Sequence, residues 1–223
     1  MIPLGDVSRR PMHFPMVTLG IILVNGFVFF LELAGGDAFI QTWAAVPADI
    51  TAGRHLITIF TAMFMHGGWL HILGNMLFLW VFGPEIEDAM NPARYLAFYL
   101  IGGVVAALAQ VAADPTSTVP TLGASGAIAA VMGAFLTTYP RDRIRTVLFI
   151  GFFFTITFIP AFLLIGLWFV IQLFSAGTVA SNVQTTGGVA YMAHVGGIVF
   201  GIVTARLFED SGRLNEERGQ GTL

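Results

Sequence analysis

The stretch Leu122-Gly123-Ala124-Ser125-Gly126 leads directly into an apolar run that continues to Tyr139. The run reads SGAIAAVMGAFLTTY at residues 125–139 and holds no charged side chain. A membrane-spanning helix needs about 20 apolar residues, and fewer where its flanks or neighbours help. We therefore interpret this run as a membrane-embedded helix that begins with a serine.

A histidine occupies a similar place in a second apolar run. His194 lies in Ala193-His194-Val195-Gly196-Gly197, near the head of the run at residues 189–208. Ionisable residues inside membrane segments are costly and therefore indicate function. A serine nucleophile and a histidine base at similar depth predict a hydrolase that works inside the membrane.

The composition is that of a polytopic membrane protein. Of the 223 residues, 56% are hydrophobic and 10% are charged, whereas a soluble domain carries roughly 25% charged residues. The absence of cysteine excludes disulfides and thiolate nucleophiles. All ten basic residues are arginine, which excludes a Ser–Lys dyad and a Schiff-base lysine.

Six apolar segments predict an all-α bundle of six transmembrane helices. We expect a cytoplasmic N-terminus at residues 1–13, one six-span domain at 14–208 and a polar, disordered cytoplasmic tail at 209–223. The fifth segment is long for one span, and we expect it to lie at the interface through Phe158 and to enter the bilayer near Pro160. The segments are residues 14–33, 69–82, 95–113, 125–139, a span within 146–174, and 189–208.

The arginines predict the orientation of the bundle. With the N-terminus inside, nine arginines face the cytoplasm and only Arg54 lies outside, as the positive-inside rule requires. The fourth and sixth segments then both run from outside to inside. Ser125 and His194 therefore lie near the outer ends of their helices, at the matching depth that a hydrogen bond needs.

Small residues predict that these two helices pack closely. In each segment they recur at helical spacing on the same face as the polar residue, although such spacing alone is also typical of ordinary helix packing. The two sets are Ser125, Ala129 and Gly133 in the fourth segment, and His194, Gly197, Gly201 and Ala205 in the sixth.

A third polar group precedes and enters the second segment. His71 and Asn75 are four residues apart and share one helical face, and His66 lies just before the helix. One such residue in a span is ordinarily a structural hydrogen bond, but three within ten residues favour a site. Asn75 and His71, with the Ser125 backbone N–H, could donate to the oxyanion that develops in acyl transfer.

A three-histidine metal site is the alternative for the same residues. His66, His71 and His194 are the possible ligands. The spacing is not the H-E-x-x-H of zinc proteases, and no carboxylate stands nearby to act as a base. We therefore expect no metal and no cofactor.

These residues together resemble the rhomboid family of intramembrane serine proteases, of the small six-span bacterial type. The resemblance rests on the order and spacing of three blocks and covers roughly residues 14–208. The blocks are His66, His71 and Asn75, then Gly123-Ala124-Ser125-Gly126, then Ala193-His194 with Gly197 and Gly201.

The resemblance implies a role for each matching residue. Ser125 would be the nucleophile and His194 the general base of a dyad without a carboxylate. Asn75 and His71 would form the oxyanion hole, and His66 would help to hold the loop after the first span. Glu87 matches a structural carboxylate at the cytoplasmic end of the second span.

Two positions depart from the family pattern. The family often has Trp-Arg some eight residues before the first histidine, where this chain has Ile57-Thr58. It also often stacks an aromatic, four residues after the serine, on the catalytic histidine, and here that residue is Ala129. We expect a different anchoring of the loop and a different neighbour for His194, but an active enzyme.

The predicted function is a serine endopeptidase that cleaves transmembrane or juxtamembrane segments of membrane proteins near the outer face. Substrates would come sideways from lipid past the fifth span, and residues 175–188 would cover the site as a lid. Nucleic acid is not an expected partner. The chain shows no targeting extension, which favours a bacterial plasma membrane.

Two other functions compete with this prediction. A catalytically inactive relative could bind transmembrane clients without cutting, but it would have lost Ser125 or His194. A channel or transporter would need polar residues through the full depth of the bilayer, and here they cluster in the outer half.

Overall fold

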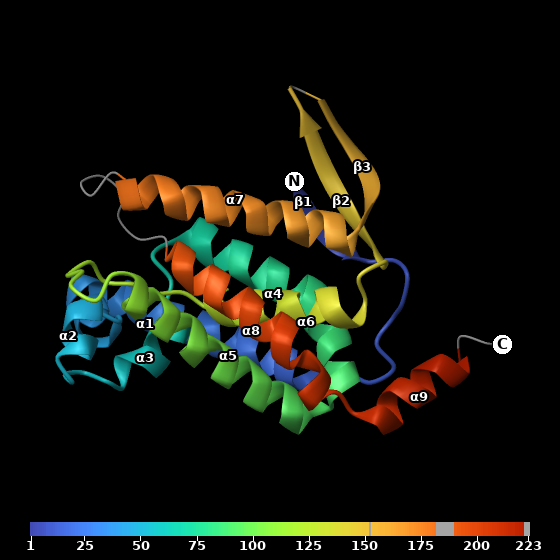
Figure 1. Ribbon diagram of the computed structural model, residues 1–223, viewed down its shortest axis with the longest axis horizontal. Coiled ribbons are helices and arrows are strands. Elements are labelled where there is room, and N and C mark those ends of the chain that lie inside the picture. The colour runs from blue at the N-terminus through green and yellow to red at the C-terminus, as the bar shows by residue number, and fades with distance from the viewer. Residues whose placement is uncertain (152, 182–189, 221–223) are drawn as a thin grey trace.

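The computed structural model of the chain describes residues 1–151, 153–181 and 190–220. It is mostly helical, and the long helices run side by side, with α7 along the outside of the bundle (Figure 1). The helix α6 lies in the middle, because it contacts α4, α5, α7 and α8. The long helices are α1 (Met16–Trp43), α4 (Trp69–Met90), α5 (Pro92–Ala113), α6 (Ser125–Thr138), α7 (Ala161–Ser181) and α8 (Tyr191–Phe208).

Short elements cover both ends of this bundle. Near the Ser125 end lie two short helices and a 3₁₀ turn, and the opposite end carries a small sheet and a last helix (Figure 1). They are α2 (Pro47–Thr51), α3 (Thr58–Thr61), η1 (Ala62–Phe64), β1 (Ile2–Asp6), β2 (Arg143–Ile150), β3 (Phe153–Pro160) and α9 (Ser211–Gln220).

The sheet corrects the all-α expectation. Its strands are antiparallel in the order β1-β2-β3. The sequence of β2 and β3 is rich in β-branched and aromatic residues, which favour strands, and Gly151 at their junction has a positive φ of 61° that glycine adopts readily. The long fifth segment therefore divides at Pro160, and only the part after it forms the helix α7.

Among the residues that the structure describes, three helices are long and apolar enough to cross a membrane: α1, α5 and α8. The helix α6 and residues 161–173 of α7 are shorter apolar helices. Large apolar side chains are exposed on α1 and α7, as expected where lipid rather than water surrounds a helix. The chain is thus a mostly helical membrane protein.

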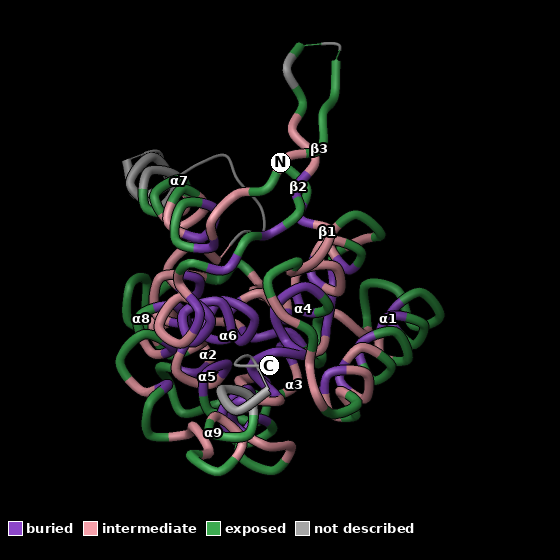
Figure 2. The backbone as a smooth tube through the Cα atoms, turned by 90° about the vertical axis from the view of Figure 1, so that its right-hand side faces the viewer, coloured by how far each residue is buried: buried purple, intermediate pink, exposed green. Residues whose placement is uncertain are grey.

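The core of the bundle is the contact between α6 and α8. Every residue of α6 from Gly126 to Phe135 is buried, and Figure 2 shows this helix at the centre of the bundle. A Cβ on Gly197 would collide with the Gly126 carbonyl oxygen, and a Cβ on Gly201 would collide with that of Ala130. The predicted close packing of these two helices by small residues is confirmed.

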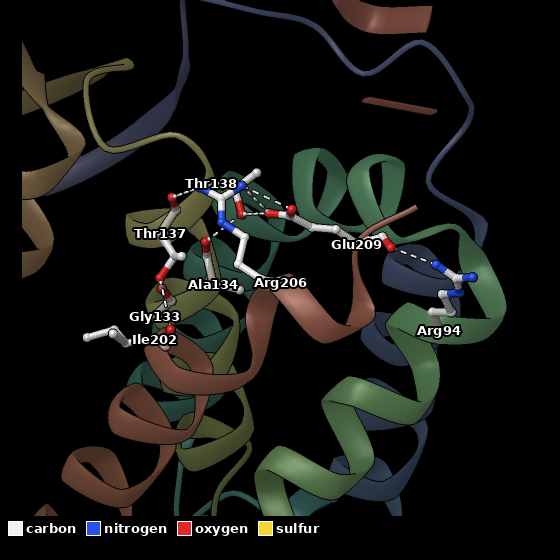
Figure 3. A network of polar contacts seen from close by, with 8 residues as sticks. All are labelled: Arg94, Gly133, Ala134, Thr137, Thr138, Ile202, Arg206 and Glu209. Carbon is white, nitrogen blue, oxygen red and sulfur yellow. Dashed lines mark hydrogen bonds and ion pairs between the residues drawn. The ribbon is translucent and has the colours of Figure 1, made fainter. Parts of the chain in front are cut away.

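A polar network ties the ends of α6 and α8 together, away from Ser125 (Figure 3). Arg206 donates to the Thr137 carbonyl oxygen at 3.0 Å and pairs with Glu209 at 3.0 Å. Thr138 Oγ1 donates to Glu209 Oε1 at 2.9 Å, and Arg94 of α5 donates to the Glu209 carbonyl oxygen at 2.6 Å. These contacts fix the position of α8 along α6.

The polar tail differs from the disordered segment that we expected, because residues 211–220 form α9. Two contacts on Asp210 tie this region to the end of α4. The Asp210 N–H donates to the Ala89 carbonyl oxygen at 2.8 Å, and Asn91 Nδ2 donates to Asp210 Oδ2 at 2.9 Å. Arg213 of α9 also pairs with Asp88 at 3.2 Å.

Glu87 lies at the far end of α4 from His71 and Asn75, where it binds the N-terminus of α1. Its carboxylate accepts the Val17 N–H at 2.9 Å, and the Thr18 N–H and hydroxyl at 2.8 Å each. The first N–H groups of a helix have no partner within the helix, and the helix dipole favours an anion there. Glu87 is only 2% exposed, so it pins α1 to α4.

Glu87→Ala should therefore lower the stability of the protein without altering the groups around Ser125. The change removes three hydrogen bonds to a buried carboxylate, and we expect a loss of about 3 kcal/mol in the free energy of unfolding. Denaturation in mixed micelles measures this free energy, and Glu216→Ala, at an exposed glutamate, is the matched control. Equal stability of the two variants would contradict the pinning role.

Candidate active site

Ser125 and His194 are in direct contact. Ser125 is the first residue of α6, and His194 lies in the first turn of α8. The distance between Ser125 Oγ and His194 Nε2 is 2.7 Å. His194 is 7% exposed. The glycines that let α6 and α8 approach each other thus bring a hydroxyl and an imidazole within hydrogen-bond distance.

A cavity of about 740 Å³ opens beside this pair. Side chains of α4, α6, α7 and α8 line it, so it lies among four helices. Its lining is apolar apart from a small convergent set of polar side chains, as is typical of ligand sites. The set consists of His71, Asn75, Ser125, Gln172, Tyr191 and His194.

His71 lies beside Ser125 across Gly123. A Cβ on Gly123 would lie 3.0 Å from His71 Nε2 and 3.5 Å from Ser125 Oγ. Gly123 also has a φ of 138°, so glycine is required there for two reasons. His71 Nδ1 accepts the Gly67 N–H at 3.3 Å. Because a neutral imidazole has one donor and one acceptor, its Nε2 carries the proton and is a donor near Ser125.

Asn75 lies one turn after His71 and lines the same cavity. It is 9% exposed, and its Nδ2 has no hydrogen-bond partner among the described residues. A buried donor without a partner costs about 1–3 kcal/mol. Such a cost is characteristic of functional sites, where a donor is kept for a group that is not yet bound.

His66 does not reach the Ser125–His194 pair. Its backbone N–H donates to both carboxylate oxygens of Glu32 at 3.0 Å, and its ring packs edge-on against His71 with centroids 5.1 Å apart. Burial, with a smaller contribution from His71, lowers the pKa of His66 to about 3. His66 is therefore neutral at physiological pH and supports His71.

Sequence reasoning missed Glu32. This carboxylate lies on α1, is 4% exposed and holds the loop that precedes α4. The available signal was an acidic side chain within the apolar segment at residues 14–33, because a carboxylate inside a membrane segment has a partner or a function.

Sequence reasoning also missed the neighbours of His194 on α7. Gln172 Oε1 lies 2.7 Å from His194 Nδ1, and the Trp168 ring lies 5.3 Å from the imidazole between centroids. Ala129 is fully buried, and it lies against Gly197 rather than supplying a ring. The available signal was Gln172 itself, the only amide, hydroxyl or charged side chain in residues 161–173.

The loop between α1 and α4 is anchored without the family's Trp-Arg pair. Thr58 is buried and its hydroxyl donates to the His55 carbonyl oxygen at 2.7 Å. Arg54 pairs with Asp49 at 2.6 Å. A bridge between Ala45 and Thr121 ties the loop to the segment that leads into Ser125.

Two further expectations concern a metal and a lid. In the part of the chain that the structure describes, no group of three or more His, Cys, Asp or Glu side chains is placed to hold a metal ion. Of the segment expected to form a lid, residues 175–181 belong to α7, and residues 182–188 lie outside the described residues.

A family model, the rhomboid domain, matches residues 53–210, which is more than half of the chain. The chain belongs to the rhomboid family. The match includes the three sequence blocks and every side chain that lines the cavity beside Ser125.

Known members of this family resemble the chain over most of its length. "Rhomboid protease GluP" of Bacillus subtilis is 29% identical over 195 residues, which are 86% of this chain and 34% of that protein. "Rhomboid protein 1, mitochondrial" of Saccharomyces cerevisiae is 25% identical over 206 residues, 90% and 55% of the two chains.

The human "Presenilin-associated rhomboid-like protein, mitochondrial" is 31% identical over 199 residues, 82% of this chain and 46% of that protein. The chain thus spans about a third to a little over half of the length of these relatives.

Proposed function

We propose that this rhomboid-family protein is an intramembrane serine endopeptidase that cleaves transmembrane or juxtamembrane segments of membrane proteins. The observation that carries the proposal is the 2.7 Å contact between Ser125 Oγ and His194 Nε2 at the edge of a cavity in which a few polar side chains converge among apolar helices. A nucleophile in contact with its base is the arrangement that covalent acyl transfer needs.

The proposed reaction has two half-reactions. Ser125 Oγ attacks the scissile carbonyl carbon while His194 Nε2 takes its proton, and His194 then returns that proton to the leaving amine as the C–N bond breaks. Water next attacks the acyl-serine, again with His194 as base, and releases the acid and the free serine. The scissile segment must be unwound first, because a helix keeps its carbonyls hydrogen-bonded.

The oxyanion formed in each step is bound by donors on one side of Ser125. His71 Nε2 and Asn75 Nδ2 supply side-chain donors, and the Ser125 N–H, in the first turn of α6, has no partner within that helix. The His71 tautomer set by Gly67 and the unpaired Asn75 Nδ2 support this assignment. Preorganised donors of this kind need no rearrangement during the reaction.

The proposed topology has six spans, with α4, α6 and α7 crossing beside α1, α5 and α8. The 22 residues of α4 span about 33 Å at 1.5 Å per residue, close to the hydrocarbon thickness of about 30 Å. The arginine distribution supports cytoplasmic termini and a site near the outer face. We propose a bacterial plasma membrane as its location and lateral access of transmembrane substrates from lipid.

Labelling with a fluorophosphonate probe tests the proposed function. Detergent-solubilised wild-type protein should become labelled, and His194→Ala should not, because the serine needs its base to react at neutral pH. Absence of labelling in folded wild-type protein would overturn the proposal and favour a rhomboid-like protein that binds transmembrane clients without cutting them.

Asn75→Ala tests the oxyanion assignment. We expect kcat to fall about 10²-fold, the typical cost of removing one oxyanion donor, while KM changes little because the contact strengthens mainly in the transition state. Cleavage of a reconstituted transmembrane substrate measures both constants, and the exposed Asn215→Ala is the control. An unchanged kcat would remove Asn75 from this role.

A further inference from the structure

We infer that Gln172 is a positioning residue that holds His194 in the tautomer and orientation required of the general base, so that α7 must be docked for the reaction to proceed. The inference rests on the proposed Ser–His hydrolysis.

The two ring nitrogens of His194 each have one partner at the same distance. Nε2 lies 2.7 Å from Ser125 Oγ, and Nδ1 lies 2.7 Å from Gln172 Oε1. A neutral imidazole is a donor at one nitrogen and an acceptor at the other. To take the serine proton, Nε2 must be the acceptor, so Nδ1 must carry the hydrogen. An amide oxygen accepts that hydrogen and thereby fixes the productive tautomer.

An amide suits this position better than a carboxylate does. The imidazole is largely buried among apolar helices, where a second ionised group is costly. The amide oxygen orients the ring without adding a charge. Without it, the Nδ1–H would be a buried donor with no partner, at a cost of about 1–3 kcal/mol, and the alternative tautomer would compete.

Trp168 gives α7 a second contact with the His194 imidazole, beside that of Gln172. It precedes Gln172 by four residues and therefore lies on the same face of α7. Its ring lies 5.3 Å from that of His194 and 6.5 Å from that of Phe78 on α4, between centroids. The aromatic contact with His194 that Ala129 of α6 cannot make thus comes from Trp168 of α7.

Because both contacts come from α7, His194 is held as the general base only while α7 lies against the bundle. The helix α7 touches the bundle along one face, where Leu164 and Ile165 are buried, and exposes Leu163 and Leu167 on the other. If α7 moves outward to admit a substrate, both contacts to His194 break. The bond can then be cut only after α7 has returned to the position described here.

The test compares three variants at position 172 by their rates of inactivation with the fluorophosphonate probe. Gln172→Leu removes the acceptor at similar size, Gln172→Asn shortens the reach by one methylene, and Gln172→Glu keeps both reach and an acceptor oxygen. Leu173→Ala, exposed on the same helix, is the matched control. Thermal unfolding of every variant is measured alongside.

We expect the Leu and Asn variants to inactivate about tenfold more slowly at saturating probe, a part of the 10²–10⁴ that a general base contributes. The apparent probe affinity should match that of the control, while the unfolding midpoint should fall by a few degrees, because the Nδ1–H of His194 loses its partner. The inactivation rate of the Glu variant should stay within about threefold of wild type, a rescue that follows from its retained acceptor, and the cost of its charge should appear only as a lower unfolding midpoint. A purely structural role would lower the unfolding midpoint but would leave the rate of the folded fraction at saturating probe unchanged.

The outcomes separate the two proposals. If wild type is labelled and the Leu or Asn variant reacts equally fast, the role of Gln172 is overturned but the proposed function stands. A Glu variant that reacts as slowly as the Leu variant would have the same meaning. Wild type that does not label at all would overturn the proposed function, and the inference about Gln172 with it.

Discussion

Ser125→Ala should abolish peptide cleavage while the bundle remains folded. The change deletes one hydroxyl at the first residue of α6 and leaves a good helix former in its place. Without the nucleophile no acyl-enzyme forms, and cleavage should fall at least about 10⁴-fold. His194 keeps its contact with Gln172, so the site retains its shape.

The assay is cleavage of a transmembrane substrate in proteoliposomes, together with thermal unfolding of the same preparations. Ser211→Ala, an exposed serine at the opposite end of the molecule, is the matched control. Residual cleavage above about a hundredth of the wild-type rate would assign the nucleophile elsewhere. A lowered unfolding midpoint would instead mean that Ser125 has a structural role.

The contact between Ser125 and His194 could be anticipated because its causes are local. Residues four apart share a helical face, small residues allow helices to approach, and arginine counts predict which way each helix runs. The pairing of α6 with α8 needed no more information than this. His71 and Asn75 were found by the same rule, and the structure brings both to the wall of one cavity.

The support of the base could not be anticipated in the same way. The contact from Gln172 to His194 depends on the rotation of α7 about its own axis and on its distance from α8. The apolar sequence of residues 161–173 leaves both open, because almost any face of that helix can meet lipid or protein. An isolated amide in such a helix indicates a partner but does not identify it.

The sheet was missed because residues 146–158 are apolar enough to be interpreted as membrane-associated helix. Their threonines and β-branched residues are spaced for a strand, and Thr146 pairs with Thr157 across the hairpin. A lipid-exposed sheet edge is not tolerated inside the hydrocarbon region. In the proposed topology the hairpin therefore lies outside that region, and the bilayer boundary near Pro160 stays a prediction.

Gly201→Val should destabilise the whole protein, because no side chain can move aside to accept it. A Cβ at this position would collide with the Ala130 carbonyl oxygen and would lie 2.9 Å from the Ala134 nitrogen, both backbone atoms of α6. Relief requires that α6 and α8 move apart, and the packing of their small faces is then lost. We expect a loss of about 3–5 kcal/mol in the free energy of unfolding.

A loss of that size corresponds to a fall of about 10 °C or more in the unfolding midpoint of a chain of this length, measured in detergent. Gly20→Val is the matched control, because a Cβ on Gly20 of α1 meets no atom within 4 Å. An unchanged midpoint for Gly201→Val would contradict the packing argument. Reduced probe labelling of the fraction that stays folded would follow from the same separation, because the contact between Ser125 and His194 exists only while α6 and α8 touch.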